Sequence, residues 1–437
     1  MTASGLVGRQ RVVIGLAGAT QAASGGMLGT ALVVYVGRTG SPLAVSMLAT
    51  AFFVSSMLFA PLWGAVGDLL GRRRALLALS ALTSLVTLGF LLVRSVWGFV
   101  GLRGLWAVFA VAFGPLMLSI VQSLVGRTHR GRSIGFVSST AAAGDVGAQL
   151  SVGVLLGVLA PSSLFLVIGA LSLLATALVA ALDDSAAAPD PLSTRDLVAN
   201  VRTRLVPDAS ERRRLRRTGL TWLYAGLALR HTAIKGIGAL VPIYLVGRLG
   251  LPAAVMGGIL AIGPAAQVGF MPLFGRLADR GNRKRLVVVG ILLSAVYTLV
   301  LAASALPAGR ALRAAVAAIG FVVIAAGFSA MDVGTVSIIG DSVPRDRESA
   351  FVGLRSTAAG IGGVLGPSIV GVTATLLGFP TAFAVASVFA FAAALLVAIT
   401  LEEPTRTTPA PTALRTIETN TGVTQVPGMH RGENERG

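Results

Sequence analysis

Two acidic residues stand inside long apolar stretches of the sequence, Asp145 and Asp332. An ionisable side chain is costly to place in a bilayer and is a functional candidate by default. Asp145 lies about eleven residues into its apolar run, at a depth where a carboxylate takes up a proton more readily than in water. That property suits reversible protonation, and the alternative is a structural carboxylate. Asp332 lies nearer one end of its run, so we expect a structural pair or a vestibule contact there.

Three basic residues share another apolar run: Arg230, His231 and Lys235. His231 and Lys235 are four residues apart and fall on one helix face, whereas Arg230 is rotated from them by about 100°. These groups could bind an anionic compound or act as counter-charges to the two acids. Snorkelling of long basic side chains to the membrane surface is the alternative. His231 could accept a proton, or it could be a hydrogen-bonded structural group.

Two further polar residues are candidates for a cavity wall. Arg103 lies a few residues from one end of its apolar run, where it could also simply snorkel. Gln21 is a neutral polar residue in the first apolar run and is a possible cavity-lining group.

The apolar runs that carry these residues fill most of the chain. Only 12% of the 437 residues are charged, against about 25% in soluble domains, and the mean hydropathy is +0.81. Runs of roughly 20 apolar residues are the length that crosses a bilayer as a helix. The sequence therefore predicts an all-α membrane protein with twelve spans, at 12–36, 43–66, 75–95, 97–124, 134–158, 162–182, 219–246, 253–274, 286–306, 312–340, 350–376 and 379–401.

Orientation follows from the Lys and Arg residues between the spans. With the N-terminus inside, the inner loops hold 21 basic residues, and the outer loops hold only Arg38, Arg94, Arg248 and Arg310. Basic residues favour the cytoplasmic side. We therefore expect a multi-pass protein of the cell membrane with both termini cytoplasmic. The predicted parts are an N-terminus (1–10), a first six-helix bundle (11–182), a linker (183–217), a second six-helix bundle (218–401) and a disordered tail (402–437).

A repeated segment relates the two halves. Pro61 to Asp68, followed by Gly71, Arg72 and Arg73, reappears 211 residues later as Pro272 to Asp279 and its basic cluster. Each copy lies between the second and third spans of its half. Two copies of a six-span unit joined by a long loop are a parallel repeat of the kind that transporters show.

The repeated loop resembles the signature loop of the major facilitator superfamily. The resemblance implies twelve helices in two pseudo-symmetric six-helix bundles and a conformational latch that locks the cytoplasmic side when it is closed. The alternative is a role in topology alone. The latch residues would be Gly64, Asp68, Gly71, Arg72, Arg73, Gly275, Asp279, Arg280 and Arg283.

Two weaker resemblances concern direction of transport. Arg103 corresponds to a fourth-span arginine of proton-coupled exporters, which suggests the drug/proton antiporter-like type. Antiporters of the superfamily often carry a G-x8-G-x3-G-P pattern in the fifth span. Here that spacing occurs in the eleventh, as Gly353, Gly362, Gly366 and Pro367, where it could serve helix packing.

These features leave two transport hypotheses open and one of another class. The first is proton-coupled efflux of lipophilic compounds by alternating access, and the second is proton-coupled uptake of an organic anion. The third is a membrane sensor that transports nothing. The chain has no cysteine, three histidines, and no nucleotide or nucleophile motif. We therefore expect no enzyme activity, cofactor, metal or nucleic acid, and a monomer whose partners are a small-molecule substrate, protons and lipid.

Overall fold

The computed structural model describes residues 8–125, 130–183, 213, 219–343 and 348–403, and every regular element in them is a helix. The first half contains α1 (Arg9–Gly37), α2 (Pro42–Leu70), α3 (Arg72–Gly89), α4 (Val96–Ala110), α5 (Phe113–Leu124), α6 (Arg130–Val158) and α7 (Pro161–Ala180). The second contains α10 (Leu220–Ile243), the π-helical turn η2 (Tyr244–Arg248), α11 (Ala253–Arg280), α12 (Arg283–Ala303), α13 (Arg310–Ser342) and α14 (Glu348–Thr400).

Several helices begin at side chains that cap them. The Ser41 side chain accepts a hydrogen bond from Ala44 N at 3.3 Å just before α2, and Ser95 accepts one from Gly98 N at 3.0 Å before α4. A hydroxyl at this position satisfies an amide that has no partner within the helix. The capped starts agree with the predicted spans to within a few residues.

Nine helical segments of the described chain are long and apolar enough to cross a membrane. Helix α3 is not among them because its 18 residues begin with three arginines, and α10 carries Arg230, His231 and Lys235 in its middle. Helix α14 counts once although it bends at Gly378, whose φ of 82° interrupts the helical backbone. With α3, α10 and the two arms of α14 counted, the described residues contain the twelve expected crossing segments.

Three spans differ in detail from the expectation. The third ends at Gly89 rather than near residue 95. The fourth is broken at Val111 and Ala112 into α4 and α5. The last two join at a bend instead of a loop. The linker and the tail lie almost wholly outside the described residues, so the predicted domain boundaries stay predictions.

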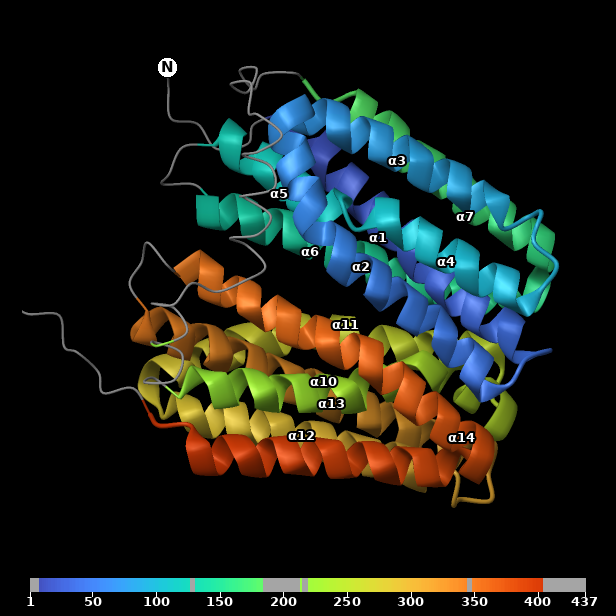
Figure 1. Ribbon diagram of the computed structural model, residues 1–437. Helices are drawn as coiled ribbons and strands as arrows, with labels where there is room; N and C mark the ends of the chain where they lie inside the picture. The colour runs from blue at the N-terminus through green and yellow to red at the C-terminus, as the bar shows by residue number, and fades with distance from the viewer. Residues whose placement is uncertain (1–7, 126–129, 184–212, 214–218, 344–347, 404–437) are drawn as a thin grey trace, which may run out of the picture. The chain divides into compact units, whose positions relative to one another are not determined.

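The helices pack as two groups, α1–α7 (blue to green in Figure 1) and α10–α14 (lime to red). Helix α1 packs on α6 and α7, and α10 packs on α14, so that the central helices of each group are covered by the others. Helices α6 and α2 of the first group contact α11 and α14 of the second. Both pairs join segments from different halves of the sequence.

The contacts between the groups lie toward the predicted external end of the helices. A Cβ placed on Gly153 of α6 would stand 2.8 Å from Gly257 Cα of α11, so the two backbones touch. Near the start of α2, Leu43 N donates to Thr375 Oγ1 at 2.9 Å, and Thr50 Oγ1 lies 3.1 Å from Ser368 Oγ. Among the described residues, the two helix groups are therefore in direct contact at the end that the topology predicts to be external.

Candidate functional site

A cavity of about 270 Å³ opens inside the first group of helices. Its wall comes from α1, α2, α4, α5 and α6, and it includes the rings of Phe52, Trp106 and Phe113. Gln21 lies in this wall and supplies a polar group to it. The volume is close to the lower end of the roughly 300–1,000 Å³ of small-molecule pockets, and the largely apolar lining with one polar side chain is typical of them.

Asp145 lies near the middle of α6, one helical turn beyond Ala141, which lines the cavity. Its side chain is exposed, and a Cβ at Gly26 of α1 would stand 3.2 Å from its Oδ1. Residues four apart share a helix face, so Asp145 lies on the face of α6 that borders the cavity. The described residues include no hydrogen-bond or ion-pair partner for this carboxylate. Its charge is therefore available to a proton or a ligand.

The packing of α1 on α6 sets the place of Asp145. A Cβ at Gly144 would overlap the carbonyl oxygen of Ala19, so only glycine lets the two backbones approach this closely. Further along the same two helices, Thr30 of α1 donates a hydrogen bond to Gln149 Oε1 of α6 at 2.9 Å. The carboxylate is thus carried by a closely packed pair of helices.

Arg103 points into the first group of helices. Its guanidinium lies over the rings of Phe52, at 5.0 Å, and Trp106, at 4.3 Å, which are cation–π distances. Its Nη2 lies 3.5 Å from the place of a Cβ at Gly29, and its Nη1 is buried with no hydrogen-bond partner among the described residues. These contacts place the Arg103 side chain between the helices, so it does not extend to the membrane surface as the snorkelling alternative would require.

Arg230 and His231 are buried in the second group. Arg230 is 1% exposed, and its Nε donates to Ser294 Oγ of α12 at 3.0 Å, with the Phe328 ring 5.7 Å away. His231 is 7% exposed, and its Nδ1 has no hydrogen-bond partner among the described residues. Arg230 therefore faces the interior of its own group.

Lys235 reaches across to the first group. Its Nζ lies 5.3 Å from the centre of the Phe53 ring of α2, and that ring packs on Gly363 of α14. Phe53 meets Phe52 edge to face at 5.1 Å, and Phe52 in turn lies under Arg103. Two aromatic rings thus connect a cation of one helix group with a cation of the other.

Asp332 of α13 forms an ion pair with Arg355 of α14. The two side chains are 21% and 27% exposed, so the pair is only partly reached by water. Sequence reasoning expected a structural pair or a vestibule contact for Asp332, and the structure places the carboxylate in such a pair.

The glycine pattern of the eleventh span packs on α10. A Cβ at Gly362 would stand 2.6 Å from the Cβ of His231, and one at Gly366 would overlap the carbonyl of Thr232. Gly353 has no such neighbour. Pro367 follows Gly366 within the helix. This close approach fixes the rotation of α10 and with it the direction of its basic residues.

The repeated loops form hydrogen bonds and an ion pair with residues of their own halves of the chain. In the second copy Glu403 accepts hydrogen bonds from Arg283 N at 2.8 Å and Lys284 N at 2.7 Å, and Arg283 pairs with Asp341. In the first copy Arg73 Nη2 donates to Ala180 O at 2.9 Å. Gly71 has a φ of 88°, in the left-handed region that favours glycine, at the turn between α2 and α3.

The remaining loop residues occupy the same end of the helices. Arg72 donates to Ser119 O at 3.4 Å, and Asp279 and Arg280 are exposed at the end of α11. Gly64 lies within α2 and Gly275 within α11. The Asp68 side chain lies outside the described part of the structure.

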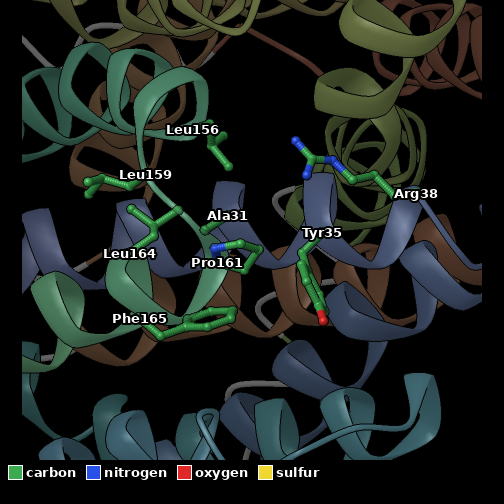
Figure 2. Close-up of a pocket in the computed structure, with 8 residues that line it drawn as sticks. All are labelled: Ala31, Tyr35, Arg38, Leu156, Leu159, Pro161, Leu164 and Phe165. Carbon is green, nitrogen blue, oxygen red and sulfur yellow. The ribbon is translucent and has the colours of Figure 1, made fainter.

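A second cavity, between α1, α6 and α7, is far smaller. Figure 2 shows it bordered by Tyr35, Leu156 and Phe165, and its volume is about 20 Å³. That is room for about one water molecule. The described residues contain no group of three or more His, Cys, Asp and Glu placed to hold a metal ion.

Sequence reasoning missed the aromatic residues of the site. Two of them, Phe52 and Trp106, line the cavity and contact the Arg103 guanidinium. The third, Phe53, contacts the Lys235 ammonium group. An aromatic residue in a membrane span gives no functional signal by itself. The available signal was the spacing of Trp106, three residues after Arg103, which puts both on one helix face.

The described chain is thus a bundle of membrane-crossing helices in two groups, with a cavity, an unpartnered carboxylate and buried cations at membrane depth. This is the architecture of a multi-pass membrane transporter. A profile of the Major Facilitator Superfamily matches residues 14–326 and 265–427, and the chain belongs to that superfamily. It is a secondary transporter and not an enzyme.

Solved structures agree on the fold. The nucleoside transporter NupG matches with a TM-score of 0.73 and 12% identity over 90% of this chain and 98% of that one. The peptide transporter POT in complex with sulfate gives 0.74 and 14% over 91% and 96%. A bacterial homologue of the human lysosomal transporter Spinster, inward-facing and unoccupied, gives 0.71 and 16% over 90% and 97%. A search of curated proteins found no match. The predicted fold class is therefore confirmed.

Proposed function

We propose that this protein exports lipophilic small molecules in exchange for protons, with Asp145 as the proton-carrying group. The observation that carries the proposal is the Asp145 carboxylate, which is exposed beside an apolar cavity and has no described cation partner. Asp332 is the weaker candidate, because its carboxylate already has Arg355 as an ion-pair partner.

The proposed mechanism is alternating access, in which the two helix groups rock against each other and open the site to one side of the membrane at a time. The described contacts between the groups lie toward the predicted external end, which corresponds to an inward-open arrangement. Protonation of Asp145 would bias one arrangement. We further propose that the protein is a monomer in the cell membrane and that both of its termini are cytoplasmic. The two six-helix bundles are then its two domains.

The first test measures proton movement in proteoliposomes that enclose a pH-sensitive dye. Addition of a compound from a panel of lipophilic aromatics should drive protons in the direction opposite to the compound. Asp145→Asn should reduce this flux to that of protein-free liposomes, while counterflow at saturating compound, which needs no net proton movement, persists. The matched control is Asp183→Asn, because Asp183 is an exposed carboxylate after the last turn of α7. Unchanged proton flux in Asp145→Asn would exclude the coupling role.

The loop residues are proposed to latch the cytoplasmic side when it closes. An aspartate at a helix end can accept hydrogen bonds from the amides of a helix N-terminus in the closed state. Asp68→Asn combined with Asp279→Asn should slow transport by about tenfold, equivalent to about 1.4 kcal/mol. Initial rates measure this, with Arg248→Gln as the control at an exposed position of the opposite end. Equal rates in the double variant and the wild type would refute the latch.

Uptake of an organic anion is the second candidate. The observation that favours it is the excess of cations in the second helix group, where Arg230, Lys235 and Arg355 accompany only Asp332 among the described intramembrane groups. Under an inward proton gradient, uptake predicts that an anion and protons enter together, whereas export predicts opposite directions. The direction of compound movement in the same liposomes separates the two.

A further inference from the structure

The cavity of the first helix group lies at the break of the fourth span. Val111, which lies in the break, and Phe113, the first residue of α5, both line it. At the break Val111 N donates to Ala107 O at 3.2 Å, and Ala112 N donates to Phe109 O, also at 3.2 Å. The regular helical hydrogen bonding is thus interrupted beside the cavity wall, while Val111 and Ala112 keep helical dihedral angles.

Pro115 explains the interruption. Proline has no N–H and its ring crowds the carbonyl four residues earlier, which here belongs to Val111. No described residue donates a hydrogen bond to that carbonyl. A carbonyl without a donor inside a membrane is costly, and discontinuous helices of transporters place such groups at binding sites. The carbonyl without a donor thus belongs to a residue that lines the cavity.

Two other polar groups lie in or beside the cavity wall. The Gln21 side chain offers an amide oxygen that accepts hydrogen bonds and an NH2 group that donates them. Val137, Ala141 and Asp145 are spaced four residues apart along α6, so the Asp145 carboxylate continues the face that lines the cavity. The rest of the wall is apolar, with Phe52, Trp106 and Phe113 contributing rings.

The nearby cations lie outside the cavity wall. The Arg103 guanidinium is placed over the Phe52 and Trp106 rings and is not part of the cavity wall. Arg355 pairs with Asp332, and Arg230 is buried against Ser294. An anionic ligand in this cavity would meet Asp145 without meeting a cation of the wall.

We propose that the cavity at the α4–α5 break binds the transported compound, and that the compound is an aromatic amine. Its rings lie among Phe52, Trp106 and Phe113, its N–H groups donate to the Val111 carbonyl and the Gln21 amide oxygen, and its positive charge is balanced by Asp145. This substrate class rests on the proposed export function. It also gives that function a reason for exchange, because the ammonium group and the proton compete for one carboxylate.

Three probes with the same ring test the charge preference: 1-naphthylmethylamine, 1-naphthylmethanol and 1-naphthylacetate. Isothermal titration calorimetry on the detergent-solubilised full chain should give the tightest binding for the amine and binding weaker by about tenfold or more for the acid, as expected for a charge that gains or loses one ion pair. The alcohol should fall between them. Tightest binding of the acid would overturn the proposal and favour the anion transporter.

Two variants locate the site. A Cβ at Gly114, in the cavity wall, has no neighbour within 4 Å, so Gly114→Leu fills the cavity without a backbone clash. Gly101 is equally open but lies outside the wall, so Gly101→Leu is the matched control on the same span. Amine affinity should fall about tenfold or more in Gly114→Leu and stay unchanged in Gly101→Leu. Pro115→Ala returns an amide to the Val111 carbonyl and should also weaken amine binding.

The outcomes distinguish this inference from the proposed function. If Asp145→Asn loses proton flux while Gly114→Leu leaves amine binding intact, export stands and this site is wrong. If Gly114→Leu loses amine binding while Asp145→Asn keeps full proton flux, the site stands and Asp145 coupling is wrong.

Discussion

The Gly257→Leu substitution is expected to arrest the transporter with its predicted external end open. A Cβ at Gly257 would stand 2.9 Å from Gly153 Cα and would overlap the carbonyl of Gln149, so no side chain fits while α6 and α11 touch. Helices with ordinary side chains at their contact lie roughly 8–10 Å apart. The leucine should therefore force α6 and α11 apart, prevent external closure and abolish transport.

Spin labels measure this opening directly, because the chain has no cysteine of its own. Leu92→Cys with Leu306→Cys places labels on exposed positions of the external end, one in each helix group. Leu70→Cys with Leu277→Cys does the same at the other end. In Gly257→Leu the external distance should lengthen and the cytoplasmic one should shorten.

Gly258→Leu is the matched control, since a Cβ at this neighbouring glycine has no contact within 4 Å. It should leave both distances and the transport rate near those of the wild type. Normal transport in Gly257→Leu would mean that α6 and α11 do not need to touch in the transport cycle.

The Arg355→Gln substitution is expected to destabilise the protein by about 2 kcal/mol and to reduce transport. It leaves the Asp332 carboxylate without its ion-pair partner among helices α13 and α14. Loss of one partner of a fully buried pair costs roughly 3–5 kcal/mol, and the partial exposure of this pair lowers that figure. Thermal unfolding in detergent and initial transport rates measure the two effects.

The double variant Asp332→Asn with Arg355→Gln separates structure from coupling. Removal of both charges leaves no unpaired ion, so stability and proton-driven transport should largely recover if the pair is structural. Recovered stability and counterflow with lost proton-driven transport would instead identify Asp332 as a coupling group. A double variant as unstable as Arg355→Gln would show that the pair contributes more than the cost of one unpaired charge.

Much of the fold could be predicted from the sequence because a bilayer leaves few choices. Every backbone amide and carbonyl must be satisfied within the chain, so an apolar run of sufficient length has to form a helix. The runs therefore predicted element type and approximate ends, as the capped starts of α2 and α4 confirm. The repeated loop at Asp68 and Asp279 predicted the superfamily, which the profile match confirms.

The positions at which a helix is interrupted or bends were harder to predict from the sequence. The Pro115 signal for the break in the fourth span was present in the sequence, yet Pro61, Pro264 and Pro272 lie within helices that continue. Whether a proline breaks a helix depends on what its neighbours offer to the freed carbonyl. The bend of α14 at Gly378 is similar, because a glycine between two spans is compatible with a loop or with a bend.

For the candidate site, the sequence by itself predicted which ionisable residues stand inside apolar runs: Asp145, Asp332, Arg103, Arg230, His231 and Lys235. Only the tertiary structure decided what each one faces. Lipid is as apolar as a protein interior, so the pattern of apolar residues along a span does not reveal the rotation of the helix. That rotation is set by close contacts such as Gly144 with Ala19 and Gly366 with Thr232, which join residues distant in the chain. These contacts place the Asp145 carboxylate against α1, one turn beyond the cavity wall, and leave Arg230 buried inside its own helix group.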